Sequence, residues 1–495
     1  MASQSTPGVY IQEISTLPAS IAAVETAIPA FIGHTATAEK DGESVRGVPT
    51  RITSMLEFEA IFGKANPETF TITVEDTYDA EKGTTEKLIN RKITATPPPD
   101  PSPYKLYYCL QMYYNNGGGP CYIVSVNDFN NLPAKGDSAT ATSILGGLEA
   151  LKAIDEPTLY VFPDVIEATL PETTGTVYKD IYDAALAQCE LLKDRFVIID
   201  VKDVTSDPFD DATNFRSNCI GSSNLKYGAA YYPNLKSSLN YAYDPTALTI
   251  THTSTYPSDP VLIEAGAQDT LPLEASNDAD PSVLKNEPSL YRSVIAEINK
   301  SYITLPPSGA IAGIYARVDS QRGVWKAPAN VDVRSIISPS KKVSHEQQAN
   351  LNVDATSGKS INAIRTFTGK GTLVWGARTL AGNDNEWKYV PVRRLYIFIE
   401  ESVKKATEFV VFEPNDANTW LRTKTMIENF LSKLWRDGAL AGAKPEQAFF
   451  VKVGLGQTMS AQDILEGRLI IEIGMAAVRP AEFIILKFSH KLQES

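Results

Sequence analysis

The chain has 495 residues, of which 43% are apolar and 21% are charged. This composition supports large buried cores and excludes a disordered or collagen-like polymer. The formal net charge of -13 repels a phosphate backbone or an anionic membrane, which argues against nucleic acid as a partner. The most hydrophobic stretch, residues 469–486, is interrupted by charged residues and a proline, so we expect no membrane insertion.

The N-terminal residues and the cysteines indicate an intracellular setting. Glu13, Pro18 and Glu25 interrupt the region where a secretory signal peptide would need an unbroken apolar core. We therefore expect assembly in the cytoplasm. The four cysteines show no CxxC spacing, so neither a disulfide scaffold nor a zinc ribbon is supported, and we expect reduced thiols in the core.

The charge is unevenly distributed along the chain. Residues 359–495 hold 19 Lys and Arg against 15 Asp and Glu, a net charge of +4. The remaining residues, 1–358, hold 27 against 44, a net charge of -17. This difference predicts an acidic body followed by a more basic C-terminal domain.

Residues 1–30 are predicted to form an N-terminal arm and linker. A short β-type run follows the turn at Thr6, and Pro18 and Pro29 prevent a long helix. Such an arm cannot close a core of its own, so we expect it to dock on other structure. The part to be docked is a strand at about residues 8–14.

Residues 31–357 are predicted to form the middle and outer domains. Helices expected at 106–114, 141–153 and 178–193 alternate with strands at 121–126, 158–162 and 195–201, as in an α/β domain. Two polar excursions, 65–103 and 236–285, leave this pattern. We interpret them as variable outer insertions.

Residues 358–495 are predicted to form a separate α+β domain, with two helices on a small sheet. The expected helices are 390–405 and 418–437, and the expected strands are 371–375, 409–412, 448–453, 469–476 and 482–489. The fold class predicted for the whole chain is therefore α+β / α/β multidomain.

Three patterns suggest chemistry but lack an essential part. Residues 354–360 resemble the end of a phosphate-binding loop, but Val353 stands where the first glycine belongs. His345 and Glu346 begin a zinc-protease motif, yet Ala349 replaces the second histidine. Asp164 and Asp200 lie at the ends of predicted strands, where they form part of a nucleotide site or cap the following turns, but no GxGxxG motif accompanies them. We predict no catalytic, cofactor-binding or metal-binding residues.

The predicted helix 418–437 is strongly amphipathic. Asn418 and Gly438 are its expected caps, and one apolar stripe is formed by Trp420, Ile427, Phe430, Leu431, Leu434 and Trp435. Arg422, Lys433 and Arg436 fall within an arc of about 60° on the opposite side. These three residues, called the basic ridge below, form either a binding surface or a merely solvated face.

The last predicted strand is apolar on both faces, as is typical of a central strand, although it ends the chain. Its apolar residues are Phe483, Ile484, Ile485, Leu486 and Phe488. Loose β-type segments at both chain ends suit strand addition between subunits, because one chain can satisfy the unpaired backbone of another. The alternative is pairing of the N-terminal arm within its own chain.

Several long segments resemble contractile tail sheath proteins of phage tails and related injection systems. The matching segments are TPGVYIQEI at 6–14, IPAFIG at 28–33, NGGGPCYIV at 116–124, LPPSGAIAGIYARVDSQRGVWKAPAN at 305–330 and most of 369–488. The last block includes VPVRRLYIFIEESV, VFEPNDANTWLRTKTMIENFLSKLWRDGALAG, EQAFFVKVG and VRPAEFIILKF. The two excursions do not match a shared core.

The resemblance implies copies stacked as six-fold rings around an inner tube, which the sheath drives through a target envelope by contracting. It implies that Val9, Tyr10 and Ile11 form a donated strand and that Phe483 to Phe488 serve a C-terminal connection, completing the small sheet of the inner domain. The basic ridge then faces the tube. Implied partners are the chain itself, sister sheath proteins, the inner tube protein, and baseplate and terminal cap proteins, in a particle that is released or anchored.

The sequence thus supports two hypotheses: a structural sheath subunit, or an α/β enzyme or ligand-binding protein with an accessory domain. The absence of a complete catalytic motif favours the first.

Overall fold

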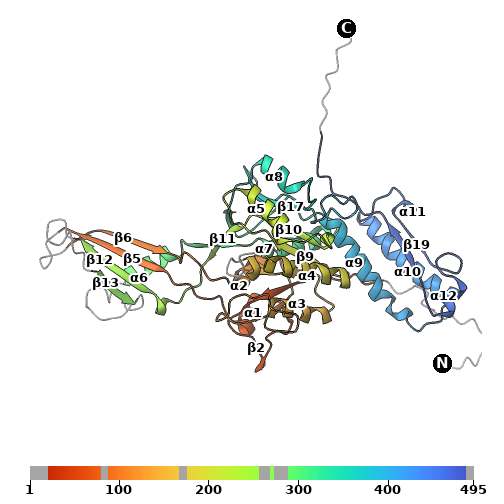
Figure 1. The fold of residues 1–495 in the computed structure, drawn as a ribbon, viewed down its shortest axis with the longest axis horizontal. Coiled ribbons are helices and arrows are strands. Elements are labelled where there is room, and N and C mark those ends of the chain that lie inside the picture. The colour runs from red at the N-terminus through yellow and green to blue at the C-terminus, as the bar shows by residue number, and fades with distance from the viewer. Residues whose placement is uncertain (1–20, 80–86, 167–175, 256–267, 273–287, 486–495) are drawn as a thin grey trace, which may run out of the picture. The chain divides into compact units, whose positions relative to one another are not determined.

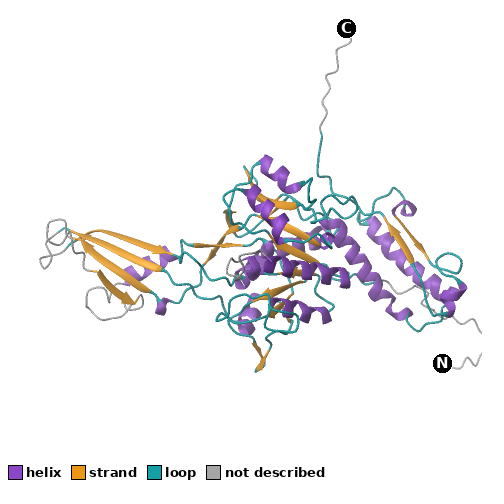
Figure 2. Ribbon diagram, in the orientation of Figure 1, coloured by secondary structure: helices purple, strands orange, loops and turns teal. Residues whose placement is uncertain are grey.

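The computed structural model describes residues 21–79, 87–166, 176–255, 268–272 and 288–485. The chain divides into two compact units. The central unit is Glu25–Arg394, and the C-terminal unit combines Leu395–Ser495 with Met1–Val24. Figures 1 and 2 show the described helices and strands of both units.

The central unit is organised around a nine-stranded sheet. In spatial order its strands are β15 (Val331–Asp332), β18 (Gly371–Val374), β17 (Ile361–Phe367), β10 (Gly228–Tyr232), β9 (Phe196–Asp200), β8 (Leu159–Val161), β1 (Pro29–Gly33), β7 (Cys121–Ser125) and β4 (Thr50–Ile52). The strands from β17 to β7 run parallel, and antiparallel strands flank them at both ends. The predicted α/β alternation is therefore confirmed.

Helices cover this sheet. Helices α2 (Leu106–Asn115) and α7 (Ser308–Arg322) pack on each other, as do α3 (Ile144–Ala150) and α4 (Thr176–Leu192), and each of the four contacts sheet strands. Strands β1, β9 and β10 are buried along their whole length, as expected for parallel strands covered on both faces. All four cysteines are free and buried, which confirms the predicted core thiols.

Short elements complete the body of the central unit. They are helices α1 (Met55–Phe62), α5 (Pro208–Asn214) and α8 (His345–Asn352), the hairpin of β2 (Glu39–Lys40) and β3 (Glu43–Ser44), and a three-stranded sheet of β14 (Tyr302–Leu305), β11 (Leu235–Asn240) and β16 (Ile336–Pro339).

The two polar excursions join in one four-stranded sheet. The first supplies β5 (Thr71–Tyr78) and β6 (Leu88–Thr96), and the second supplies β12 (Thr249–Thr255) and β13 (Gln268–Pro272). Strands β12 and β5 pair in parallel, and helix α6 (Pro288–Ile298) contributes to a shared apolar core with them. Neither excursion forms this core by itself, because the core takes residues from both excursions and from α6.

The C-terminal unit has two long helices and a small sheet. The helices are α9 (Val390–Thr407), whose first turn belongs to the central unit, and α10 (Ala417–Arg436); α11 (Pro445–Ala448) and α12 (Ala461–Leu465) are short. The sheet pairs β19 (Phe449–Lys452) with β20 (Glu472–Met475) in antiparallel fashion. Two helices on a small sheet were predicted here and are found.

Three details differ from the sequence predictions. The units divide at Arg394 and not at residue 358, because β17 and β18 belong to the nine-stranded sheet. The expected strand 409–412 is a short 3-10 helix, Glu408–Val410, followed by a turn. The expected strand 482–489 is absent from its described part, 482–485, which is not paired with any other described strand.

Candidate interaction surfaces

Helix α10 presents the basic ridge on a well-ordered amphipathic scaffold. Ile427, Phe430, Leu431 and Leu434 are buried as predicted, together with Met426, Thr419 and Thr423, while Trp420 and Trp435 are half-buried. The N-cap lies two residues earlier than expected: the Asp416 carboxylate, and not Asn418, accepts a hydrogen bond of 2.9 Å from Thr419 N. Gly438, with φ of +87°, follows the helix end as predicted.

Arg422, Lys433 and Arg436 are all exposed on this helix. The ridge extends about 21 Å, because Arg422 and Arg436 are separated by 14 helical steps of about 1.5 Å each. Within the described part of the chain none of the three forms an ion pair, whereas Lys424, beside the apolar stripe, lies 3.8 Å from Glu428. The ridge therefore has positive charge available to an anionic partner.

The C-terminal unit as a whole is not basic. Residues 395–495 hold 12 Lys and Arg against 13 Asp and Glu, a net charge of -1. The excess of Lys and Arg that gives residues 359–495 a net charge of +4 lies in residues 359–394, which belong to the central unit. The prediction of a basic C-terminal domain is thus wrong for the compact unit, and the positive surface is a local property of α10.

The terminal segments fall partly outside the described residues. Val9, Tyr10 and Ile11 of the expected donated strand lie outside them, as do Leu486 and Phe488. Phe483, Ile484 and Ile485 are described and are 71%, 80% and 80% exposed. Three consecutive large apolar side chains in contact with water form a surface that favours contact with another chain.

The small sheet of the C-terminal unit has only two strands among the described residues, β19 and β20. A two-stranded sheet gains stability when further strands are added along its outer edges. In β20 the Met475 carbonyl already accepts a hydrogen bond from Tyr396 Oη at 2.8 Å. Strand β19 is held in place by packing on α10.

A further exposed apolar group escaped the sequence analysis. Phe409, Val411, Phe412 and Leu421 are 39%, 63%, 102% and 64% exposed. For residues 409–412 the β-type pattern predicted a strand, which implies burial, so the pattern concealed the exposure of Phe409, Val411 and Phe412. The one sign of exposure in the sequence was that residues 409–412 are all apolar, without the alternating polar residues of a half-buried strand.

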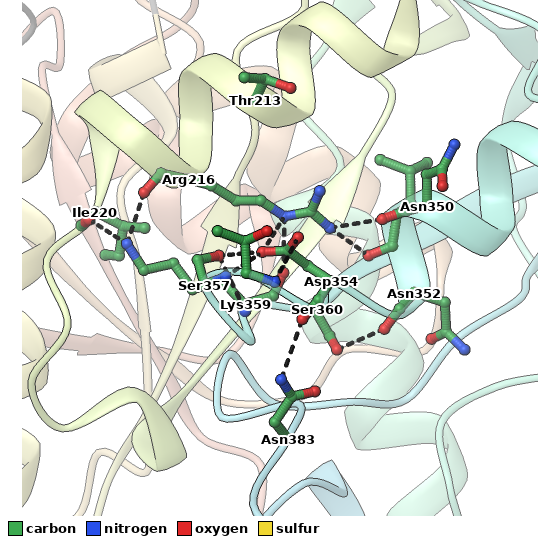
Figure 3. A network of polar contacts seen from close by, with 12 residues as sticks. Thr213, Arg216, Ile220, Asn350, Asn352, Asp354, Ser357, Lys359, Ser360 and Asn383 are labelled. Atoms are coloured by element: carbon green, nitrogen blue, oxygen red, sulfur yellow. Dashed lines mark hydrogen bonds and ion pairs between the residues drawn. The ribbon is translucent and has the colours of Figure 1, made fainter.

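The loop at 354–360 is occupied by contacts within the protein (Figure 3). Lys359 Nζ donates to the carbonyl oxygens of Arg216 and Ile220 at 2.6 and 2.9 Å, and burial lowers its pKa. Arg216 donates in turn to the carbonyl oxygens of Asn350, Leu351 and Lys359. Because Lys359 serves backbone carbonyls, it is not positioned as a phosphate ligand.

The acidic residues at the strand ends cap helices. Asp164 accepts backbone hydrogen bonds from Lys105 and Leu106 at the start of α2 and from His34 N. Asp200 accepts one from Ser308 N at 2.7 Å at the start of α7, and burial raises its pKa to about 7. The two carboxylates therefore cap helices that are distant in the sequence, and not the turns that follow them as one of the two alternatives predicted.

Neither metals nor membranes are indicated in the described part of the chain. No group of three or more His, Cys, Asp or Glu side chains is arranged to hold a metal ion there. None of the described helices combines the length and the apolar character needed to cross a bilayer.

Comparison with known families gives two matches. Residues 179–380 match the phage tail sheath protein central domain, and residues 382–491 match the phage tail sheath C-terminal domain. Together the two ranges cover more than half of the chain.

Solved structures match over nearly the whole length. The anti-feeding prophage (AFP) helical sheath in its contracted state is 30% identical with a TM-score of 0.60, and a chain of the AFP baseplate is 31% identical with a TM-score of 0.60; each match covers 99% of this chain and 100% of the other. The PVC sheath complex of an extracellular contractile injection system, also contracted, is 28% identical with a TM-score of 0.61, covering 99% of each chain.

Curated relatives match over shorter ranges. The tail sheath protein of Vibrio phage KVP40 is 26% identical over 130 residues, which are 26% of this chain and 19% of the phage protein. The chain thus spans about a fifth of the length of this relative.

These matches define the class of protein as the phage tail sheath family, and this chain belongs to it. It is a structural subunit of a contractile sheath in a phage tail or tail-like particle, and the alternative of an α/β enzyme is not supported.

Proposed function

We propose that this chain polymerises as stacked six-fold rings around an inner tube, with the basic ridge of α10 facing the tube. The single observation that carries the orientation is the ridge itself: three exposed cations, free of ion pairs among the described residues, on a unit whose net charge is slightly negative. A solvated helix face normally mixes both signs of charge. An acidic outer surface on the tube would complement the ridge.

The terminal arms are proposed to connect neighbouring subunits. Residues 8–14 supply a strand to the two-stranded sheet of a neighbouring C-terminal unit, and Phe483 to Phe488 serve a second connection. The small number of strands in the described sheet, β19 and β20, and the exposure of Phe483, Ile484 and Ile485 support this proposal. Subunits tethered in this way stay connected while the lattice rearranges.

Contraction is proposed to be powered by assembly. Subunits that can pack in two alternative lattices store the difference in contact free energy between them, and no nucleotide is needed. The free energy released by each subunit adds up along the sheath. Assembly takes place in the bacterial cytoplasm on a baseplate and ends at a terminal cap protein, with sister sheath proteins as further members of the lattice.

Charge reversal on the ridge tests the orientation. The triple variant R422E/K433E/R436E should lose extended assembly on the tube, with at least about a tenfold drop in tube-bound subunits, but still form contracted sheath. The matched control is K404E/K444E/R479E, which makes the same charge change at exposed positions of the same unit, outside the ridge and outside the sheet of β19 and β20.

Co-sedimentation with purified tubes, followed by negative-stain microscopy, measures both products. Equal tube binding by the ridge variant and the wild type would show that the ridge faces elsewhere. A wild-type protein that remains a monodisperse globule, alone and with its tube, would count against sheath assembly itself.

A further inference from the structure

The chain leaves the central unit at two places, and one cluster of side chains holds both of them. The unit boundaries lie between Val24 and Glu25 and between Arg394 and Leu395. The second crossing lies inside α9, so a continuous helix carries the chain across it. Thr26 and Arg394 are 368 residues apart in the sequence, yet Arg394 Nη2 donates to the Thr26 carbonyl at 2.8 Å. The two crossings are therefore tied to each other on the central side.

Asp319 of α7 completes the cluster. Its carboxylate accepts two hydrogen bonds from the Arg394 guanidinium, at 3.0 and 2.5 Å, and a third from Thr26 Oγ1 at 2.6 Å. The Arg394 and Asp319 side chains are only 3% and 6% exposed, so water does not compete for these contacts. We call Thr26, Asp319 and Arg394 the crossing clamp.

The crossing clamp is connected to the nine-stranded sheet by two routes. Thr158, directly before β8, donates from its hydroxyl to the Thr26 carbonyl at 3.0 Å. On the other side, Arg394 Cζ lies 4.5 Å from the ring centroid of Tyr315 in α7. The Tyr315 hydroxyl shares a hydrogen bond of 2.7 Å with that of Tyr231 in β10. A displacement of the sheet therefore carries the clamp with it.

A buried ion pair of this kind adds little to the free energy of unfolding. Removing two charges from water offsets most of their attraction, and an apolar pair of similar volume often stabilises a protein equally well. The ion pair does fix geometry, because the planar guanidinium binds a carboxylate in one orientation. Its place beside both crossings indicates that it positions the chain there.

We propose that the crossing clamp makes the two chain connections of the central unit move together, so that a displacement of this unit reaches α9 and the N-terminal arm at the same time. The inference rests on the proposed sheath function, in which subunits pass from one lattice to another, and it names positioning residues for that step. Helix α9 suits the role, because 18 helical residues form a stiff element about 27 Å long. The arm contacts α9 again within the C-terminal unit, where Val24 N donates to Ser402 Oγ at 3.2 Å.

Double variants separate positioning from stability. D319L/R394M replaces the ion pair with apolar side chains and removes the bonds to Thr26, so the melting temperature should stay within a few degrees of the wild type. The matched control is R317M/D332N: Arg317 lies on the same helix, α7, and its ion pair with Asp332, at 3.4 Å, joins no crossing. R394K keeps the charge but loses the planar pair of hydrogen bonds, and should give intermediate results.

Hydrogen exchange of the purified subunit, read by mass spectrometry, tests the clamp without any assembly. In D319L/R394M the amides of residues 25–28 and 390–394 should exchange at least about tenfold faster, because the contacts that hold these segments are lost. Exchange in β1 should not change. R317M/D332N should match the wild type in all of these segments.

Negative-stain microscopy of sheaths assembled on the tube tests the consequence for contraction. D319L/R394M should form extended sheaths, because both substituted side chains are buried within the subunit. When urea is added below the unfolding concentration, these sheaths should lose complete contraction, since the central unit no longer moves both connections together. Wild-type and R317M/D332N sheaths should contract fully.

Two results would overturn the inference and leave the sheath function intact: full contraction of D319L/R394M sheaths, or wild-type exchange rates at residues 25–28 and 390–394 in this variant. A melting temperature of D319L/R394M far below that of R317M/D332N would also overturn it, because the pair would then serve the stability of the central unit. If the wild-type chain forms no sheath on its tube, the proposed function fails first, and the exchange experiment still tests the clamp.

Discussion

Asp200 shows how a single buried carboxyl group responds to the body of the central unit. It ends β9, is fully buried, and accepts a hydrogen bond from Ser308 N, while burial raises its pKa to about 7. In the unfolded chain its pKa is about 3.9. The folded protein therefore binds more protons than the unfolded chain between these two values.

The sign of the resulting pH dependence follows directly. Because the folded-state pKa is raised, the contribution of Asp200 to the free energy of unfolding is complete below about pH 4 and is lost as the pH rises through about 7. D200N, which keeps an acceptor oxygen for Ser308 N, should remove this decline and become more stable relative to the wild type with rising pH, by a few kcal/mol at pH 8.

Urea unfolding at several pH values measures the difference between D200N and the wild type. D244N is a control for which we expect the opposite change in the free energy of unfolding. Hydrogen bonds from Thr246 lower the pKa of Asp244, so D244N should reduce stability above about pH 4. Parallel stability curves for D200N and the wild type would contradict the raised pKa of Asp200.

At the scale of the element, the beginning of α10 depends on one cap. Asp416 adopts extended backbone and accepts from Thr419 N, whereas Asn418 lies inside the helix. D416A should lower the free energy of unfolding by about 1 kcal/mol, the usual value of an N-cap. N418A, at the position that the sequence pattern had suggested, should change it by less than about 0.5 kcal/mol.

Chemical denaturation of the purified subunit distinguishes these outcomes. A larger loss for N418A than for D416A would show that the helix begins at Asn418 in solution.

At the scale of the whole molecule, the N-terminal arm is expected to control polymer length. Deleting residues 1–14 should leave a folded monomer, because a β-type run this short cannot form a core of its own, but should abolish long polymers by removing the donated strand. Deleting residues 1–5 is the control, since it keeps the β-type run. Size-exclusion chromatography and negative-stain microscopy measure both properties, and normal tubes from the longer deletion would exclude a donated strand.

Local patterns in the sequence were sufficient to predict most of the individual helices and strands. The strands at 121–126, 158–162 and 195–201 correspond to β7, β8 and β9, and the amphipathic period of residues 418–437 corresponds to α10. These predictions are correct because burial of one helix face leaves a periodic pattern of apolar residues, and burial of a whole strand leaves a continuous apolar run. The resemblance of long segments to sheath proteins, which the comparisons confirm, came from the same residues.

The tertiary structure alone decided what depends on distant residues. It joins two excursions more than a hundred residues apart in one sheet around α6, assigns β17 and β18 to the central unit, and directs Lys359 to backbone carbonyls. It also shows that the positive surface belongs to one face of α10 and not to the whole C-terminal unit. A sequence pattern records whether a residue prefers burial, but the partner that buries it is chosen by chain topology.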